Sequence, residues 1–183
     1  MRKIAILSSL LSICFVIAVQ AQTTAPKPDP ALQKLHAWVG HWTFEGESKP
    51  GPLGPGGKDS GEYDGKMILG GFAFQGRWTD KGPARETRGL EIYGYDPVNK
   101  NYPFSIYMDD GGIFSGAMSV SGNTYTLPGK LSAAGKVFDA RLIITNAADG
   151  MSLTLKGEVS ADGKTWSTFT EAKYTKVPPA AKK

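Results

Sequence analysis

The chain has 183 residues, one cysteine and a formal net charge of +4 at neutral pH. That length suits a single domain, and one cysteine excludes a disulfide framework within the chain. The charge is too small to give the basic surface on which nucleic-acid binding depends, so we expect no nucleic-acid partner.

Residues 1–21 predict a secretory signal peptide. The basic pair Arg2-Lys3 precedes an apolar run, and Ala21 marks the expected cleavage site. The run is too short to span a membrane. Cleavage would leave 162 of the 183 residues, remove the cysteine and lower the charge to +2. We therefore expect export to the periplasm or the medium, without a membrane span. The alternative, a lipid anchor on Cys14, fits less well because a lipobox has a small residue where isoleucine precedes this cysteine.

A flexible lead-in over residues 22–28 is followed by a short predicted helix. Asp29 is a suitable cap, and Pro30 suits the first helical position because its missing N–H costs nothing there. An apolar stripe recurs at three- and four-residue spacing, formed by Leu32, Leu35, Trp38 and Val39. Gly40 ends the helix.

From Trp42 to Val177 the pattern becomes that of an all-β protein, with turn signals every 8–12 residues. The short connections predict that consecutive strands pair, and closure into a barrel removes the exposed edges. We therefore predict an antiparallel up-and-down barrel of about ten strands with a short N-terminal helix over residues 29–177, and a disordered tail over 178–183. A two-sheet sandwich is the alternative. The expected strands are 41–47, 61–69, 72–79, 86–95, 101–109, 112–121, 123–132, 136–145, 151–160 and 165–176.

Glycine and proline add two further expectations. Several glycines fall inside expected strands, where they permit the sharp bending of a small barrel: Gly76, Gly89, Gly94, Gly116 and Gly157. The longest connection, residues 48–60, is rich in both residue types. A loop of this length is typical of a lid or binding loop, or it is an insertion without a function.

The junction Val39-Gly40-His41-Trp42 resembles the Gly-x-Trp motif of lipocalin and calycin barrels. The stretch from Leu32 to Val177 also resembles a bacterial family of unknown function with a lipocalin-like barrel. The matching elements are Leu35 through Trp42, Gly94-Tyr95-Asp96, Lys100-x-Tyr102, Tyr107-Met108-Asp109 and Glu171-x-Lys173-Tyr174.

The resemblance implies that Trp42 packs on the barrel floor beside the helix. Lipocalins often place an arginine over this tryptophan, whereas the last strand here offers Lys173 and Lys176, either of which can lie over the ring. The nitrobindin type of barrel binds haem through a histidine late in the chain. No histidine follows His41, so we expect no cofactor.

Catalytic and metal-binding motifs are absent from the sequence. The two histidines, His36 and His41, straddle the helix end and have no Cys or carboxylate cluster around them, so no metal site is expected. There is no G-x-S-x-G motif and no phosphate-binding loop. An acid–base enzyme would need two carboxylates with separated pKa values in a cleft. The carboxylate pairs in the sequence are Glu45/Glu47, Glu62/Asp64 and Asp109/Asp110, of which the first two have the spacing of a solvated strand face.

The candidate ligand-binding residues are aromatic or charged and fall in expected strands or at their ends. Three arginines with apolar neighbours either line a polar lumen or face outward. Tyrosines suit a pocket because they combine an apolar body with a hydroxyl group. The candidates are Trp42, Arg77, Arg88, Tyr93, Tyr107, Asp109 and Arg141.

Three functions remain open at this point. The first is an exported barrel that binds a small amphipathic or polar ligand in its lumen, with the 48–60 loop as a lid. The second is a solid barrel that serves as a structural or protein-interaction domain of the cell envelope. The third is a hydrolase or isomerase that uses carboxylates. We expect a binding protein rather than an enzyme. An open lumen of a few hundred Å³ lined by tyrosine and arginine would favour the first, whereas one filled by Phe and Met would exclude it.

Overall fold

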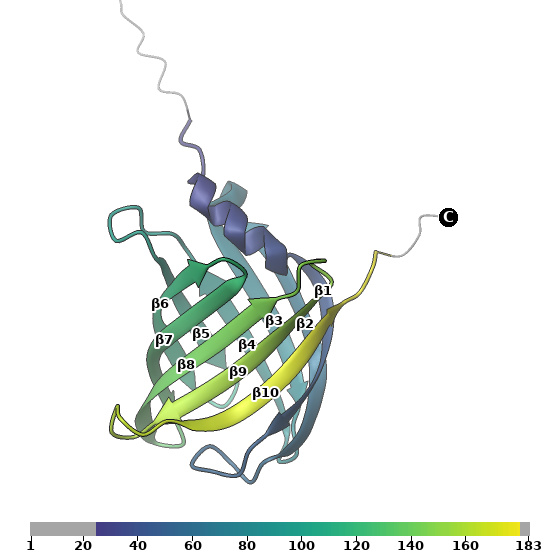
Figure 1. Cartoon of the computed structure of the whole chain (residues 1–183), viewed down its shortest axis with the longest axis vertical. Coiled ribbons are helices and arrows are strands. Elements are labelled where there is room, and N and C mark those ends of the chain that lie inside the picture. The colour runs from purple at the N-terminus through teal and green to yellow at the C-terminus, as the bar shows by residue number, and fades with distance from the viewer. Residues whose placement is uncertain (1–24, 180–183) are drawn as a thin grey trace, which may run out of the picture.

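A computed structural model describes residues 25–179 as a closed barrel of ten antiparallel strands (Figure 1). The predicted signal peptide, residues 22–24 of the lead-in and residues 180–183 of the tail lie outside this range. The strands are β1 (Gly40–Ser48), β2 (Gly57–Ile68), β3 (Ala73–Lys81), β4 (Glu86–Tyr93), β5 (Tyr102–Met108), β6 (Ile113–Ser121), β7 (Thr124–Ala133), β8 (Lys136–Asn146), β9 (Ser152–Ser160) and β10 (Ser167–Lys176).

The strands follow one another around the ring in chain order, and β1 closes it by pairing with β10. That closing register runs from Trp42 opposite Lys176 to Ser48 opposite Thr170. The predicted up-and-down barrel is therefore confirmed, and the two-sheet sandwich is wrong. Because every strand has two partners, the sheet has no open edge.

The first connection is shorter than the 48–60 loop predicted from the sequence. β1 and β2 stay paired as far as Ser48 opposite Gly57, so only residues 49–56 connect them. Glycine and proline marked a break, but glycines at the start of β2 remain in the ladder because the partner strand holds them in register. The connection also contains its own bridge between Gly51 and Gly54.

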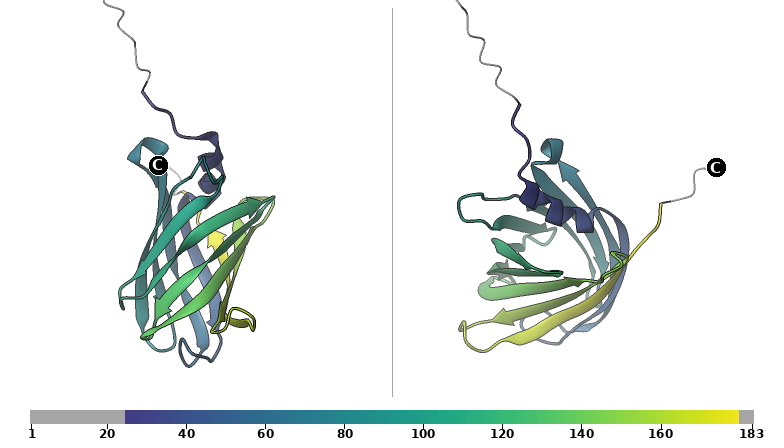
Figure 2. Two further views of the ribbon diagram at one scale, coloured as in Figure 1. Left: turned by 90° about the vertical axis from the view of Figure 1, so that its left-hand side faces the viewer. Right: turned by 45° about the horizontal axis from the view of Figure 1, so that its top comes forward.

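A 3₁₀ helix, η1 (Pro30–Trp38), lies across one end of the barrel, as the tilted view in Figure 2 shows. The Asp29 side chain caps it by accepting a hydrogen bond from the Ala31 amide at 2.8 Å. Two hydroxyl groups from the barrel wall hold the helix in place. Tyr102 donates to the carbonyl of Ala31 at 2.8 Å and Tyr125 to that of Lys34 at 2.9 Å. Among the described residues, no helix is long and apolar enough to span a membrane.

The helix closes this end through an aromatic cluster. Trp38 is buried, and its ring packs against Phe74, Tyr93 and Tyr125 with ring centroids 4.6–6.1 Å apart. Trp42 lies next to it and donates its indole N–H to the Trp38 carbonyl at 3.2 Å. A second short 3₁₀ turn, η2 (Leu69–Gly71), joins β2 to β3 at the same end. We call this the plugged end and the opposite one the mouth.

Candidate ligand-binding cavity

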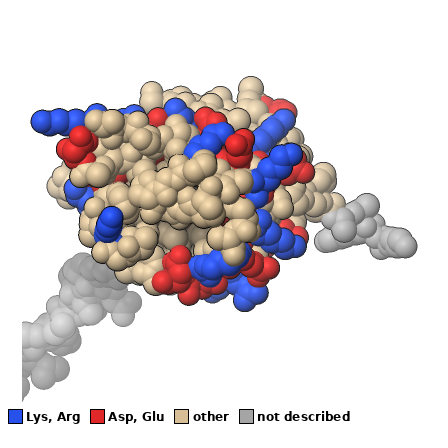
Figure 3. All heavy atoms as spheres, turned by 90° about the horizontal axis from the view of Figure 1, so that it is seen from below, with Lys and Arg blue, Asp and Glu red and all other residues tan. Residues whose placement is uncertain are grey.

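The barrel encloses a cavity of about 800 Å³. It begins at Trp38 and Trp42 beside η1 and reaches the loops of the mouth, where Leu53 and residues 110–112 and 133–135 line it. Figure 3 views the molecule from the mouth side, with uncharged residues over the centre and charged side chains toward the edge. A volume of this size is in the range of small-molecule sites. It differs from the solid core that a purely structural barrel would have.

The cavity has two unlike sides. The polar wall comes from β1–β4 and β10, and its polar and aromatic members are Ser48, Asp59, Tyr63, Trp78, Asp80, Thr87, Glu91, Tyr93, Thr170 and Tyr174. The same strands add Trp42, Phe44, Phe169 and Ala172. The apolar wall comes from β5–β9 and consists of Ile106, Met108, Phe114, Leu131, Ala140, Leu142, Ile144, Leu153 and Leu155. Of the described residues that line the cavity, four are carboxylic acids and none is Lys, Arg or His. Three of the acids lie inside the barrel, and the fourth, Asp110, lies at the mouth.

Each internal carboxylic acid stands opposite a glycine on the neighbouring strand. The cross-strand pairs are Gly46 with Asp59, Gly61 with Asp80, and Gly76 with Glu91. A Cβ atom on Gly46 would collide with the Asp59 carboxylate, and one on Gly76 with the Glu91 carboxylate and the Tyr63 hydroxyl. The glycines at 46 and 76 therefore provide the space in which these acids fit inside the barrel.

Glu91 is held by tyrosines. It is buried, and the Tyr93 hydroxyl donates to its Oε2 at 2.9 Å. Burial raises the pKa of Glu91, while hydrogen bonding from Tyr63 and Tyr93 pulls that pKa partly back down. The pKa values of both tyrosines are raised by burial and by the nearby carboxylate, so their hydroxyls stay protonated and act as donors.

Asp59 and Asp80 lie closer to the mouth and are less completely hydrogen-bonded. Ser48 donates to Oδ2 of Asp59 at 2.7 Å, but Oδ1 of Asp59 and Oδ1 of Asp80 are buried without a hydrogen-bond partner. Burial, together with the neighbouring charge of Asp59, raises the pKa of Asp80 to about 6. Burial and the three internal acids raise the pKa of Tyr174.

Two of the predicted site residues, Trp42 and Tyr93, line the cavity near its plugged end. Their neighbours in sequence face the other way, because side chains alternate along a strand. Arg77 and Arg88 are exposed on the outer face, and Arg88 forms an ion pair with Glu86 at 2.7 Å.

The remaining predicted site residues also lie outside the cavity. Tyr107 is 48% exposed and is absent from the lining. Arg141 forms an ion pair with Glu158, and its guanidinium group lies 4.2 Å from the centre of the Trp166 ring. Asp109 stands beside the mouth and accepts hydrogen bonds from Arg85 at 3.2 Å. The arginines therefore face outward, and the polar lumen is built from acids and tyrosines instead.

The lysine at the end of the last strand does lie over the floor tryptophan. The Lys176 ammonium is 5.1 Å from the centre of the Trp42 ring, directly across the β1–β10 pair. A cation over an aromatic face stabilises this packing by about 0.5–1 kcal/mol or more. Lys176 thus has the position that the resemblance to lipocalins gives to an arginine.

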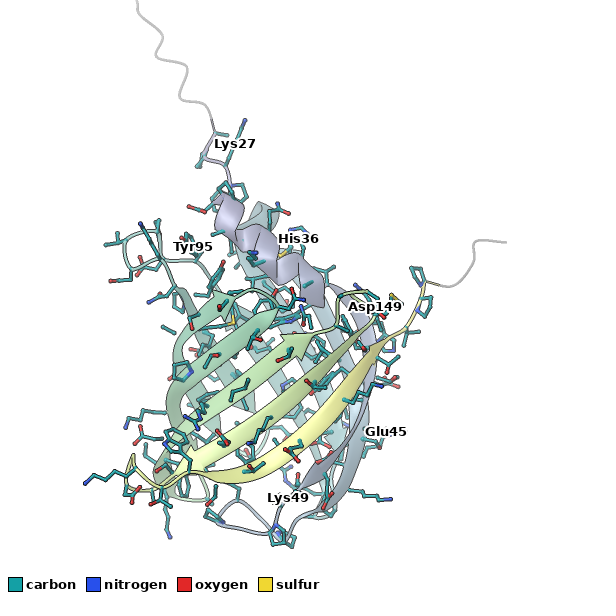
Figure 4. The ribbon with its side chains drawn as sticks, in the orientation of Figure 1. Lys27, His36, Glu45, Lys49, Tyr95 and Asp149 are labelled. Carbon is teal, nitrogen blue, oxygen red and sulfur yellow. The ribbon has the colours of Figure 1, made fainter. Side chains whose placement is uncertain are left out.

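The carboxylate pairs noted in the sequence are on the outside of the barrel or at its rim. Glu45 lies on the outer face of β1 (Figure 4), and Asp64 on β2 contacts His41 at 2.9 Å. Asp110 lines the mouth but is paired with Arg85 at 3.0 Å, and hydrogen bonds from the Gly112 amide and from Arg85 lower its pKa. No three His, Cys, Asp or Glu side chains within residues 25–179 are grouped so as to hold a metal ion.

Sequence reasoning missed the three internal acids. Asp59 fell in the expected 48–60 loop, Asp80 lay just beyond an expected strand end, and Glu91 was not singled out. One signal was present: glycines alternate with aromatic residues along β2–β4, which indicates inward positions where a bulky neighbour needs space.

Fold and cavity together define the class of this protein: a ten-stranded antiparallel barrel with a helix at one end and an internal cavity. The crystal structure of Rv2717c from M. tuberculosis is similar, with a TM-score of 0.59, 17% sequence identity and coverage of 83% of this chain and 100% of that chain. A de novo designed fluorescence-activating β-barrel matches with a TM-score of 0.42, 12% identity and coverage of 78% of this chain and 96% of that one. No match was found among curated proteins.

Residues 27–176 match the model of the family described as protein of unknown function DUF1579. The chain belongs to this family. The predicted resemblance to a family of unknown function with a barrel fold is thereby confirmed. At 17% sequence identity, the structural similarity to Rv2717c supports the fold alone.

Proposed function

We propose that the protein binds a small amphipathic molecule inside its barrel. The observation that carries the proposal is the cavity of about 800 Å³ with one polar and one apolar wall. An apolar body would lie against the aliphatic side chains of β5–β9, where burial is favourable. A polar head would lie against the acids and tyrosines of the opposite wall.

The β1–β2 connection belongs to the proposed site. Leu53 lines the cavity at the mouth and packs against the core. The Lys49 amide donates to the carbonyl of Phe169 at 2.8 Å, which anchors one end of the connection to β10. The segment 49–56 would therefore act as a lid over a bound molecule, with Leu53 as its apolar contact.

Export is part of the proposal and is supported by the signal-peptide pattern of residues 1–21. A binding protein outside the cytoplasm would capture its ligand there. N-terminal sequencing of the protein from the periplasm of its host tests this, and we expect the mature chain to begin at Gln22. An intact N-terminus in the cytoplasmic fraction would refute export.

Binding in the lumen is tested with Nile red, an uncharged dye whose emission rises in apolar surroundings. Leu142 points into the cavity and the next residue, Ile143, lies on the outer face of the same strand. We expect one dye per protein, with weaker binding to Leu142→Trp and unchanged binding to Ile143→Trp. Equal binding to both variants, each shown to be folded by circular dichroism, would refute a site in the lumen.

A carboxylate enzyme is the second candidate, because Asp59 and Asp80 form an internal acid pair in which the pKa of Asp80 is raised to about 6. One protonated and one ionised carboxyl group would suit acid–base catalysis. We favour binding, since the described lining residues include no histidine and no metal ligand cluster. A screen of nitrophenyl esters and glycosides tests this alternative, and turnover that Asp59→Asn abolishes would establish it.

A further inference from the structure

The internal charge of the cavity is one-sided. The described residues that line it inside the barrel contribute Asp59, Asp80 and Glu91 but no basic side chain. The fourth lining acid, Asp110 at the mouth, is paired with Arg85. Buried carboxylates without a counter-charge are costly, because the ionised form loses its hydration. Either protons or a positively charged ligand must offset this cost.

The three acids differ in how well they are satisfied. Glu91 has tyrosine hydroxyl groups on its carboxylate and needs no further donor. Asp59 is only 6% exposed, and the hydrogen bond from Ser48 occupies one of its oxygens while the other has no partner. One buried oxygen of Asp80 is also without a partner. Buried acceptors of this kind are rare in folded proteins and gain most from a charged N–H donor.

The surroundings of this acid pair suit an organic cation. Tyr174 stacks on Phe44 with ring centroids 4.7 Å apart and meets Tyr63 edge-on at 6.3 Å. Trp78 lines the cavity from β3, the strand that carries Asp80. Aromatic faces attract an ammonium group and the carbon atoms attached to it. A bare metal ion would find two carboxylates here and no third ligand in a suitable group within residues 25–179.

We propose that the ligand of this cavity is a small amphipathic amine, whose protonated N–H donors bind the unpartnered oxygens of Asp59 and Asp80. This inference rests on the proposed binding function and names the ligand class. The alkyl or aryl body of the amine lies along the apolar wall. Fatty acids and other anionic amphiphiles are excluded, because their carboxylates would face internal acids of the same charge.

The test is displacement of Nile red by four compounds that share an eight-carbon chain: octylammonium, 1-octanol, octanoate and octyltrimethylammonium. At pH 7.5 we expect octylammonium to bind tenfold or more tightly than octanol, since a hydrogen bond to a charged group contributes about 1.5–3 kcal/mol and 1.4 kcal/mol is tenfold. Octanoate should bind most weakly. Octyltrimethylammonium has no N–H donor and should lose most of the advantage.

Three variants locate the effect. Asp59→Asn and Asp80→Asn should reduce the preference for octylammonium over octanol at least fivefold, because each variant removes a negative charge from the proposed ammonium site. Asp64→Asn removes a carboxylate from the outer face of the same strand as Asp59 and should keep the preference.

The outcomes separate the two proposals. Nile red and octanol binding in the lumen without a preference for octylammonium would overturn the amine inference and leave the binding function standing. Equal affinity for octylammonium and octyltrimethylammonium would overturn the role of N–H donors. No lumenal binding of Nile red or of any of the four compounds would overturn the binding function itself.

Discussion

The two walls of the cavity are built from the same kind of strand but by different rules. Along the apolar wall, every second residue of β8 is hydrophobic and points inward, as Ala140, Leu142 and Ile144 do. Along the polar wall, glycines stand opposite acids, so that Gly76 leaves space for Glu91. Burial of apolar side chains in one wall stabilises the fold. Burial of carboxylic acids in the other wall lowers the stability of the fold.

The largest predicted effect is a difference in unfolding free energy between a substitution in the packed core and one at the cavity surface. Leu127 is fully buried and does not line the cavity, so Leu127→Ala should lower the free energy of unfolding by about 3 kcal/mol. Leu142 borders empty space, and Leu142→Ala should cost about 1 kcal/mol because fewer contacts are lost. Urea unfolding measures both. Equal costs would mean that the cavity is closed up in solution.

The glycines of the polar wall give the next effect. Gly76→Ala places a methyl group against the Glu91 carboxylate and should destabilise the barrel by about 2 kcal/mol. Gly94→Ala is the matched control, because a Cβ there meets no atom within 4 Å. Urea midpoints compare the two variants. If Gly76→Ala is as stable as Gly94→Ala, the carboxylate does not depend on that space.

The internal charge predicts that Asp80→Asn stabilises the folded protein, and that the size of this stabilisation depends on pH. The pKa of Asp80 is raised to about 6 by burial and by Asp59. The other titratable groups of that wall are Glu91, Tyr63, Tyr93 and Tyr174. A raised native pKa means that the protonated acid favours folding, and this contribution is lost as pH rises from about 4 to above 6.

Asp80→Asn should therefore leave the melting temperature unchanged near pH 4. At pH 8 the substitution should raise the melting temperature by about 2–4 °C. This corresponds to a gain in the free energy of unfolding on the order of 1 kcal/mol, after allowance for the solvent contact of Asp80. Asp64→Asn on the outer face should show no such dependence. A melting temperature that Asp80→Asn lowers at pH 8 would contradict an unfavourable charge inside the barrel.

The smallest effect is expected on the outer face. Arg88→Gln removes an exposed ion pair with Glu86 and should change the free energy of unfolding by less than about 0.5 kcal/mol. Nile red binding should be unchanged, since Arg88 points away from the cavity. A large loss of binding would show that the site extends beyond the lumen.

Much of the fold was predictable because it depends on local patterns. Turn residues mark nine connections, and the helix stripe of Leu32, Leu35 and Trp38 became the buried face of η1. The site was less predictable. Trp42 and Tyr93 line the cavity, but Arg77, Arg88 and Arg141 do not. For Arg77 and Arg88, polar residues occupy both faces of β3 and β4, so period-2 spacing cannot tell which face turns inward. On β8 the apolar alternation does mark the inner face, and Arg141 lies on the other one.

By itself, the sequence determined a ring of ten short strands with a tryptophan floor, because strand period, turn chemistry and the Gly40-His41-Trp42 junction are all local features. Only the tertiary structure decided what the ring encloses. In β2, either Asp59 and Tyr63 or Glu62 and Asp64 could face the interior, because side chains alternate along a strand. The register of β2 with β1 and β3 places Asp59 and Tyr63 inside. That choice brings acids from the consecutive strands β2, β3 and β4 to one wall of a cavity of about 800 Å³, and the pairing of β1 with β10 closes the ring that encloses it.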